Sequence, residues 1–361
     1  MKKAHIIAFY LPQYHPFPEN DAWWGKGFTE WTNVGKAKPL FPGHYQPRVP
    51  ADLGYYDLRV PEVREAQVEL AKEAGIDAFC YWHYWFSGKQ LLEKPLQEVV
   101  RLGKPDFPFC LAWANHSWEK RNWNADCNQL SLEVLIKQTY GGQREIEEHF
   151  YTMLPMFKDK RYYRVHGKLL FLFNQITKIP NDYLANFIAC WQNLALKNNL
   201  PGFYFVAQIR KTNELTLPNA KYFDGFNYSN EVRLLGENKI LRRFKRIIST
   251  FIHFPLCIHR FSSILPTFLN PICLQKNVYP VILSGFDHSP RSSTAACIIT
   301  GFTPEVFYKH ILQVLDLIKF KELDDRIIFL RSWNEWAECN YMEPDLKYGK
   351  KYIETLAKAL K

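Results

Sequence analysis

Two glutamates three residues apart, Glu335 and Glu338, stand in the stretch RSWNEWAE at residues 331–338. On a helical turn, side chains at this spacing lie on one side, with Cβ atoms about 5–6 Å apart. Glycosidic chemistry needs such a pair, because one carboxylic acid protonates the leaving oxygen while a second carboxylate acts as base, nucleophile or charge stabiliser. Desolvation by the neighbouring indoles would raise the pKa of one of the two. The alternative is a helix N-terminus whose glutamates interact favourably with the macrodipole.

A second candidate for ligand binding is the aromatic run FCYWHYWF at residues 79–86. It is too aromatic for one side of a strand, so some rings must point into a site or stack beneath it. Sugars pack their C–H faces on such rings and need polar partners for their hydroxyls. The sequence offers these partners in Asn115, His116, Asp287, Arg291 and Asn334. Core packing is the alternative for each individual ring.

The elements that must position these groups are eight short apolar runs with helix-length segments between them. Their unbroken hydrophobicity predicts strands buried on both faces, as in a parallel sheet. The runs are Ile6–Leu11, Ala78–Trp82, Phe109–Trp113, Leu169–Phe173, Phe203–Ala207, Gly225–Asn227, Val278–Leu283 and Ile327–Leu330. Amphipathic helices are predicted between them, for example Pro61 to Ala74, with a stripe that includes Ala66, and Pro304 to Ile318 with Thr303 as N-cap. The pattern predicts an α/β fold, a (β/α)8 barrel.

Polar or aromatic clusters follow nearly every predicted strand. They are 13–15, 83–85, 115–116, 174–175, 208, 227–228, 287–288 and 334–335. Because the carboxyl ends of barrel strands converge on one mouth, the clusters would line a single pocket. Ordinary loop polarity is the alternative for any one of them.

The composition limits the classes of protein to which the chain can belong. The chain has 361 residues, 47% of them hydrophobic and 23% charged, which excludes wholesale disorder and suits one barrel over residues 1–361. No apolar run approaches the roughly 18–20 residues of a membrane span, and the N-terminus lacks a signal-peptide cleavage site. The eight cysteines form no C-x-x-C pair, which favours a reducing cytoplasm over disulfides or a zinc site.

The absence of other motifs narrows the chemistry further. The sequence has no D-x-D motif for a metal-bound nucleotide sugar, no P-loop and no G-x-S-x-G elbow. We therefore expect no metal and no cofactor. The formal charge of +10 is concentrated in one segment without a recognition motif, so no nucleic-acid partner is expected.

That basic segment covers residues 236–277. No acidic residue stands between Glu237 and Asp287, whereas seven basic residues do. Within it, residues 239–252 have apolar side chains at helical spacing, with basic residues on the other face. Such a helix can lie peripherally on an anionic membrane. The alternative is a barrel helix with a basic solvated face.

Several stretches resemble the WbsX proteins of surface-polysaccharide gene clusters, whose domain is similar to glycoside hydrolase family 99, the endo-α-mannosidase family. The matching stretches are AFYLPQYH (8–15), WWGKGFTEWTNV (23–34), FCYWHYWF (79–86), WAN (113–115), WNEWAE (333–338) and YMEPD (341–345). The resemblance runs from Ile7 to about Leu356 and is weakest between Lys211 and Asn277. It implies substrate-binding roles for motif residues. These are Tyr10, Gln13, Trp24, Glu30, Trp31, His83, Tyr84, Trp85, Trp113 and Trp336.

The resemblance also implies a (β/α)8 barrel and a retaining mechanism in which the sugar's 2-hydroxyl attacks the anomeric carbon. Glu335 would be the base that assists this hydroxyl, and Glu338 the acid that protonates the leaving group. One departure from the family pattern is His116, which stands where a glutamate is expected and replaces an acceptor by a titratable ring.

We therefore expect a cytoplasmic carbohydrate-active enzyme of surface-polysaccharide assembly, peripheral to the inner membrane. It would cleave or transfer a glycosidic linkage in an oligosaccharide or lipid-linked glycan. A catalytically silent sugar-binding scaffold at the inner membrane is the alternative, and the retention of both glutamates favours the enzyme.

Overall fold

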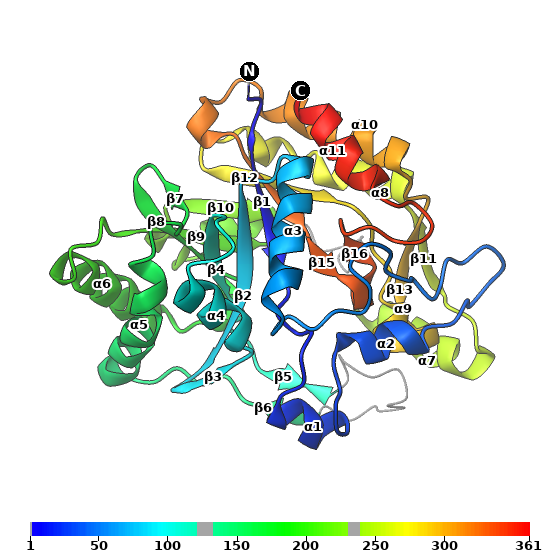
Figure 1. Ribbon diagram of the computed structural model, residues 1–361, viewed down its shortest axis with the longest axis horizontal. Helices are drawn as coiled ribbons and strands as arrows, with labels where there is room; N and C mark the ends of the chain where they lie inside the picture. Colours follow the sequence, from blue (N-terminus) through cyan, green and yellow to red (C-terminus); the bar gives the residue numbers. More distant parts are fainter. Residues whose placement is uncertain (1, 121–132, 230–238) are drawn as a thin grey trace.

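Eight parallel strands form a closed ring at the centre of the computed structural model, which describes residues 2–120, 133–229 and 239–361 (Figure 1). The strands are β1 (His5–Tyr10), β2 (Ala78–Phe86), β4 (Phe109–Trp113), β8 (Lys168–Phe173), β9 (Phe203–Ile209), β10 (Gly225–Tyr228), β12 (Val278–Leu283) and β14 (Ile327–Arg331). The ring closes because β1 pairs in parallel with both β14, where His5 is opposite Ile327, and β2, where Ile7 is opposite Ala78. All eight predicted strands and the predicted barrel are confirmed.

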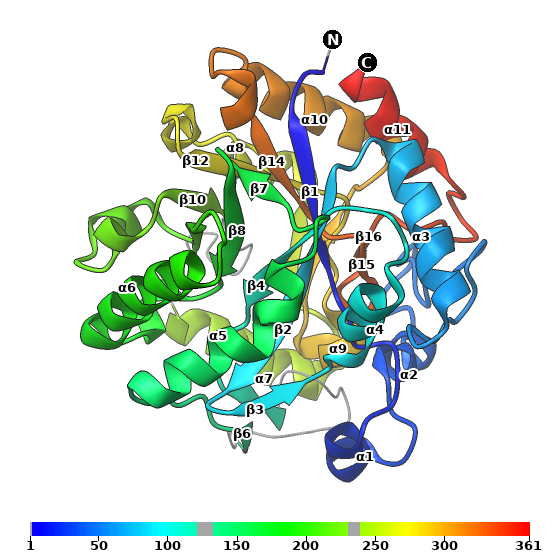
Figure 2. The ribbon, with the colours of Figure 1, turned by 60° about the vertical axis from the view of Figure 1, so that its left-hand side comes forward.

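Helices surround this ring (Figure 2). They are α3 (Pro61–Ala74), α4 (Lys94–Leu102), α5 (Gln143–Phe157), α6 (Asn181–Lys197), α10 (Pro304–Ile318) and α11 (Lys351–Leu360). The two helices predicted from their termini begin and end as expected. In α3, Gly75 takes the left-handed conformation with φ of 81° that ends the helix. In α10, the Thr303 side chain accepts a hydrogen bond from the Val306 amide at 3.3 Å.

Two details differ from the prediction. The connection from β9 to β10 contains the 3-10 helices η3 (Thr212–Thr216) and η4 (Ala220–Tyr222) instead of an α-helix. In α3, Ala66 is exposed, whereas Arg64 and Gln67 are buried. Hydrogen bonds stabilise these buried polar groups, as in the bond from Tyr10 Oη to Gln67 Oε1 at 2.6 Å. Apolar periodicity alone could not detect a buried face built from such polar residues.

Short elements lie around the carboxyl ends of the strands and in the connections. They are α1 (Pro18–Trp24), α2 (Glu30–Lys36), β3 (Lys89–Leu91), β5 (Trp118–Glu119), β6 (Val134–Ile136), β7 (Arg164–Val165), α7 (Lys239–Ile252), β11 (Cys257–Arg260), α8 (Phe261–Phe268), α9 (Ser289–Ser292), η7 (Ser293–Ala295), β13 (Cys297–Thr300), β15 (Asn334–Glu335), η9 (Trp336–Glu338) and β16 (Asn340–Tyr341). Of the predicted basic segment, residues 236–238 lie outside the described residues.

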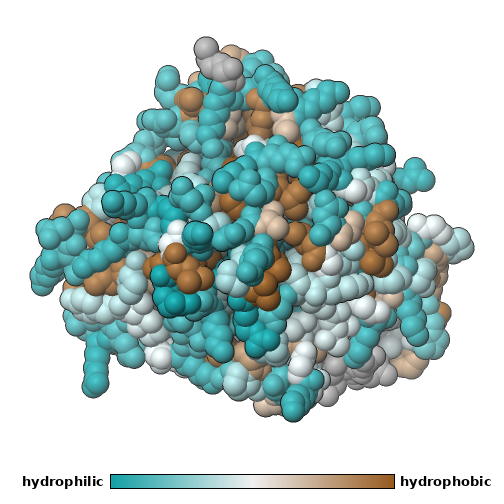
Figure 3. Space-filling model, viewed as in Figure 1, coloured by the Kyte–Doolittle hydropathy of each residue, from teal (hydrophilic) through white to brown (hydrophobic). Residues whose placement is uncertain are grey.

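The two chain ends lie close together at the amino end of the barrel (Figure 1). Lys3 Nζ there donates a hydrogen bond to the Ala359 carbonyl at 3.0 Å. Over the face seen in Figure 3, hydrophilic residues predominate and hydrophobic ones form separate small areas. In the described part of the chain, no helix has the length and apolar character needed to cross a bilayer.

Candidate active site

A cavity of about 650 Å³ opens at the carboxyl ends of the barrel strands. Residues on or shortly after every barrel strand except β10 contribute to its described lining. Six of the predicted site residues line it, namely Tyr84, Asn115, His116, Arg291, Glu335 and Glu338. The strand ends therefore converge on one pocket as predicted, with the exception of β10, which contributes no residue to the described lining.

The two glutamates come from β15 and η9, which follow β14, and two neighbouring residues fix this segment. Asn334 Oδ1 accepts from the Leu11 amide at 2.8 Å, and its Nδ2 donates to the Leu11 carbonyl at 3.0 Å. The Tyr14 hydroxyl donates to the Asn334 carbonyl and accepts from the Trp336 amide at 3.0 Å. The backbone on both sides of Glu335 is thereby attached to the segment that follows β1.

Arg291 brings the two glutamates together. Its Nη1 lies 2.6 Å from Glu338 Oε1 and 3.4 Å from Glu335 Oε1. The two carboxylate oxygens are therefore no farther apart than the sum of these distances. A third carboxylate, that of Glu30 at the start of α2, lies 3.2 Å from Arg291 Nη2 and is fully buried. Arg291 is thus surrounded by three buried carboxylates from two distant segments.

The three carboxyl groups of this cluster differ in how strongly their surroundings favour the charged form. Arg331 Nη2 lies 3.3 Å from Glu338 Oε2, so Glu338 faces two guanidinium groups. Burial, followed by the neighbouring charge of Glu338, raises the pKa of Glu335 to about 7. Burial also raises the pKa of Glu30, although Arg291 opposes this effect. Of the two glutamates, Glu335 is therefore the one on which burial favours a proton, whereas the two guanidinium groups favour negative charge on Glu338.

The loop between β12 and β13 supplies the remaining groups beside Glu338. His288 Nε2 lies 3.7 Å from Glu338 Oε1. The Asp287 amide donates to the Glu338 carbonyl at 2.8 Å, while the Asp287 carboxylate accepts from His44 Nε2 and from Gln46 Nε2, both at 2.7 Å. Burial would raise the pKa of Asp287, but these hydrogen bonds and the His44 contact lower it below its usual value. Asp287 therefore anchors the loop and points away from the cavity.

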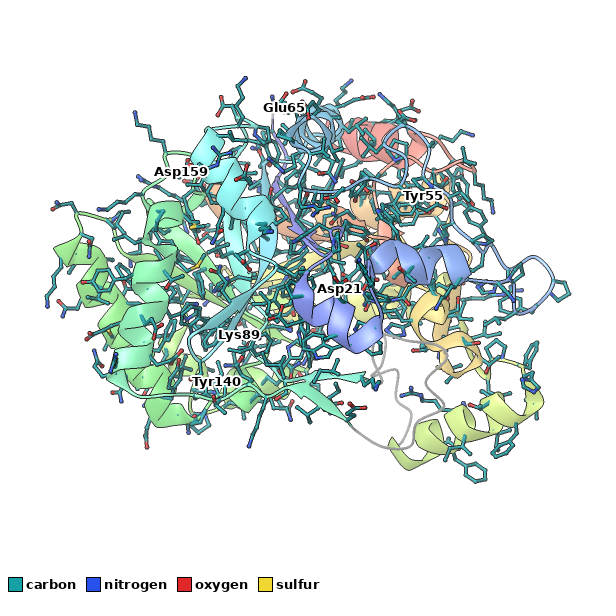
Figure 4. The ribbon with its side chains drawn as sticks, turned by 60° about the horizontal axis from the view of Figure 1, so that its bottom comes forward. Asp21, Tyr55, Glu65, Lys89, Tyr140 and Asp159 are labelled. Atoms are coloured by element: carbon teal, nitrogen blue, oxygen red, sulfur yellow. The ribbon has the colours of Figure 1, made fainter. Side chains whose placement is uncertain are left out.

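The opposite wall of the cavity is polar and aromatic. His116 Nδ1 lies 3.3 Å from Asn174 Nδ2, and Asn174 Oδ1 accepts from Arg210 Nη2 at 3.2 Å. Tyr140 belongs to the same wall; Figure 4 brings this side forward, with Tyr140 labelled between β6 and α5. The side chain of Asn115, through its Nδ2 atom, donates to the backbone carbonyl of Gln175 at 2.9 Å and so stabilises this wall. Hydroxyl groups of a ligand would meet donors and acceptors here.

Strand parity explains why four predicted residues lie away from the cavity. Side chains alternate along a strand, and in β2 it is Trp82 and Tyr84 that line the cavity. His83 and Trp85 therefore point outward, where His83 Nε2 lies 2.7 Å from His149 Nε2 and Trp85 stacks on the same imidazole. Two others point outward as well. They are Tyr10, which donates to Gln67, and Trp113, which packs against Phe187.

Other predicted residues lie beneath or beside the site. Trp336 stacks on Tyr341 and donates to Glu343 at 2.6 Å. Trp31 donates to the Tyr56 carbonyl at 2.7 Å. Burial raises the pKa of Glu343 to about 7, which suits a carboxyl of the buried floor. Two other predicted site residues also lie outside the described cavity lining. They are Trp24, which is partly exposed beside Phe28, and Gln13, whose buried side-chain amide has no hydrogen-bond partner among the described residues.

Sequence reasoning missed several residues of the cavity. These are Trp82, Trp118, Gln138, Tyr140, Lys178, Arg210 and Arg331, whereas His288 belongs to the predicted cluster 287–288 and does line the cavity. Arg331 stands in the motif of the two glutamates, and a cation beside paired carboxylates was a signal that could have found it. Trp82 could have been found from strand parity with Tyr84. Tyr140 and Arg210 stand in segments without a distinctive motif.

The chain is similar to proteins of known families over nearly its whole length. The family described as Glycosyltransferase WbsX matches residues 6–356. The uncharacterized protein WxcX of Xanthomonas campestris pv. campestris, from two strains, is 32% identical over 372 aligned residues, which cover 99% of this chain and 50% of WxcX. The chain thus spans about half the length of the curated relatives it matches.

Two solved structures share the fold. A GH99 endo-alpha-mannosidase from Bacteroides thetaiotaomicron is 15% identical, with a TM-score of 0.55 over 98% of this chain and 96% of that one. A glycoside hydrolase-like protein is 14% identical, with a TM-score of 0.62 over 100% of this chain and 95% of that one. At these identities the likeness shows the barrel fold alone.

Proposed function

The chain belongs to the WbsX glycosyltransferase family, and from this membership we propose that it cleaves or transfers a glycosidic linkage with Glu335 and Glu338 as its two catalytic carboxylates. The observation that carries the proposal is the contact of both carboxylates with Arg291 Nη1 inside a polar and aromatic cavity. Fold and family are those of carbohydrate-active proteins.

The spacing of the carboxylates argues against an inverting reaction. Inverting glycosidases keep their two carboxyl groups roughly 6.5–9.5 Å apart to admit a water molecule, whereas retaining ones keep them about 5–5.5 Å apart. The shared contact with Arg291 limits the separation of the two Oε1 atoms to the sum of 2.6 and 3.4 Å, which is below the inverting range.

In the reaction we propose, Glu335 accepts the proton of the sugar's 2-hydroxyl as this oxygen attacks the anomeric carbon. Glu338 donates a proton to the leaving oxygen. In the second step Glu338 accepts the proton of the incoming water or sugar hydroxyl as its oxygen attacks the anomeric carbon, and Glu335 returns its proton to the 2-oxygen as the bond between that oxygen and the anomeric carbon breaks. Because burial favours the proton on Glu335, the proposed reaction requires that substrate binding shift it toward Glu338. A hydroxyl that donates to Glu335 favours its ionised form and so drives the shift. The pH–rate profile would report the pair instead of either residue.

The two roles can be separated by the leaving group. Fluoride leaves with little help from an acid, so Glu338→Gln should still release fluoride from a glycosyl fluoride in the first turnover, although later turnovers slow because Glu338 is also the base of the second step, and it should lose activity on an oligosaccharide. Glu335→Gln should lose activity on both. If instead Glu335→Gln is the variant that fluoride spares, the roles of the two residues are reversed.

The substrate we propose is an oligosaccharide or a lipid-linked glycan of surface-polysaccharide assembly. The cavity falls within the roughly 300–1,000 Å³ of small-molecule sites, and its walls combine amides and histidines with tryptophan and tyrosine rings. Purified protein incubated with lipid-linked and released surface glycan, followed by mass spectrometry, tests this proposal. Product masses distinguish hydrolysis from transfer. Glycan that binds but stays unchanged, equally with both Gln variants, would support the sugar-binding scaffold instead.

A membrane-bound substrate would suit a protein that itself binds an anionic bilayer, and we propose that α7 makes this contact at the inner membrane's cytoplasmic face. The helix presents apolar side chains to solvent, with Phe244 60% and Phe251 79% exposed, while Ser249 is 2% exposed. These exposures favour the membrane contact over the alternative of a barrel helix with a solvated basic face. Apolar side chains flanked by basic residues are the pattern of interfacial helices.

Sedimentation with vesicles containing about a third anionic lipid tests the membrane contact. Phe244→Glu and Phe251→Glu should each reduce the bound fraction, because an acidic side chain replaces the inserting ring. Phe320→Glu is the matched control, since this ring is 84% exposed at the end of α10 and lies outside α7. Equal sedimentation of all three variants and the wild type would refute the contact.

A further inference from the structure

Three side chains that can bind a metal ion lie together on the small sheet formed by β11 and β13. Cys257, His259 and Cys297 offer ligand atoms that all lie within 4.8 Å of one another, and none of the three lines the cavity. The Cys257 Sγ and His259 Nε2 atoms are 3.4 Å apart. We refer to these three residues as the Cys–His cluster.

The sheet places these side chains on one face. Cys257 and His259 are two residues apart on β11, so they point to the same side. In the parallel pairing, Cys297 of β13 is opposite Cys257. Figure 1 shows β11 and β13 side by side, on the same side of the molecule as α7. The cluster therefore arises from strand register, although its members are up to forty residues apart in the sequence.

The chemistry of the cluster suits one class of ion. Two thiolates and an imidazole are ligands that zinc prefers, with Zn–S about 2.3 Å and Zn–N about 2.0–2.1 Å. Ligand atoms at tetrahedral angles are then roughly 3.5–3.8 Å apart. The Sγ–Nε2 distance of 3.4 Å is already close to this value, and the other pairs need only a small approach. Hard cations such as Mg²⁺ prefer oxygen ligands.

We propose that Cys257 Sγ, His259 Nε2 and Cys297 Sγ bind one Zn²⁺ ion, with the fourth position open to water or another exogenous ligand. Binding would release the two thiol protons to solvent, while His259 binds as the neutral imidazole. This differs from the expectation of no metal site, which rested on the absence of a C-x-x-C pair.

The ion would connect the α7 region to the segment that carries Arg291. β11 follows α7 in the chain, and α7 packs against η7, just before β13. The Cys297 carbonyl accepts from the His288 amide at 3.1 Å, and the Ile299 amide donates to the Phe286 carbonyl at 2.9 Å. An ion joining β11 to β13 would therefore restrain the loop around Arg291 without entering the cavity.

The test uses the full chain, reduced and stripped of metal, then dialysed against Zn²⁺ and analysed by elemental mass spectrometry. We expect about one zinc per chain, and a rise in Tm of about 4 °C at a hundredfold excess over Kd. Co²⁺ in place of zinc should give the thiolate charge-transfer absorption of a sulfur-ligated ion.

Three variants decide the ligand assignment. The double variant Cys257→Ser, Cys297→Ser should lose the zinc, and His259→Ala should weaken binding by at least about tenfold. Cys190→Ser is the matched control, because this half-buried thiol stands on α6 and should leave the zinc content unchanged. Circular dichroism checks that each variant is folded.

Two results would overturn the proposal. The first is a zinc content in the folded double variant equal to that of the wild type. The second is a reduced wild type that retains no zinc, with an unreduced mass lower by two hydrogens, because the two thiols would then form a disulfide. Neither readout requires glycan turnover, so they are independent of the proposed catalytic function.

Discussion

Replacing Glu335 by glutamine should change the stability of the protein in a pH-dependent way. Burial and the charge of Glu338 raise the pKa of Glu335 to about 7 in the folded chain, against about 4.5 when it is exposed. A raised pKa means that the folded state binds more protons than the unfolded state between these two values. The wild type therefore loses stability as the pH rises from about 4.5 to 7, and a neutral glutamine removes this loss.

The size of the effect follows from the two pKa values. Each pKa unit corresponds to roughly 1.4 kcal/mol, so ionised Glu335 costs up to about 3 kcal/mol at pH 8. With an unfolding entropy of about 2.1 cal/mol/K per residue, this corresponds to about 4 °C in Tm for a chain of 361 residues. Because part of this cost is already present at pH 5, the gap in stability between Glu335→Gln and the wild type should grow by about 2.5 kcal/mol, or about 3 °C in Tm, between pH 5 and pH 8.

Thermal unfolding of both proteins across this pH range measures the gap. Glu338→Gln is the matched control with the opposite sign, because Glu338 lies 2.6 Å from Arg291 and 3.3 Å from Arg331. Removing one partner of a buried ion pair costs about 3–5 kcal/mol, so this variant should be less stable than the wild type at pH 8. A Glu335→Gln gap that stays constant with pH would refute the electrostatic reasoning.

Two further predictions concern how the site is positioned. Tyr14→Phe should lower stability by about 1–3 kcal/mol and also reduce kcat, because the Tyr14 hydroxyl forms hydrogen bonds with the backbone on both sides of Glu335. Tyr10→Phe is the control and should affect Tm without reducing kcat. Equal losses of kcat in the two variants would contradict the positioning role of Tyr14. Gly285→Ala should lower Tm and activity, since a Cβ there would clash with the backbone carbonyl oxygen of Cys339. Gly35→Ala is the control, because this glycine has open space around it within α2, and it should raise stability by about 0.5–1 kcal/mol. Unfolding curves and glycan turnover measure the effect of both glycine variants. A Gly285→Ala variant with unchanged Tm and activity would contradict the predicted clash and show that the segment around Gly285 can shift.

The sequence predicts the barrel well because its signals are local. Each buried strand is a continuous apolar run, and the termini of α3 and α10 carry their own proline, glycine and threonine signals. The pair Glu335 and Glu338 is likewise visible, since both stand in one short motif. These features need no knowledge of which distant segments meet.

The rest depends on tertiary structure. Nothing in the motif of the two glutamates indicates that Arg291, from another loop, and Glu30, from the start of α2, complete the cluster. The aromatic run of β2 has similar side chains on both faces, so the sequence does not predict which face points into the barrel. The Cys–His cluster depends on the register of β11 with β13, which no spacing in the sequence reveals.

The most direct test of the central claim is the anomeric configuration of the first product, followed by ¹H NMR as wild-type protein turns over its glycan. A retaining reaction with two carboxylates predicts that the new linkage or reducing end first appears with the configuration of the bond that was broken. Both Gln variants should leave the glycan signals unchanged. A first product of inverted configuration would contradict the mechanism built on Glu335, Glu338 and Arg291.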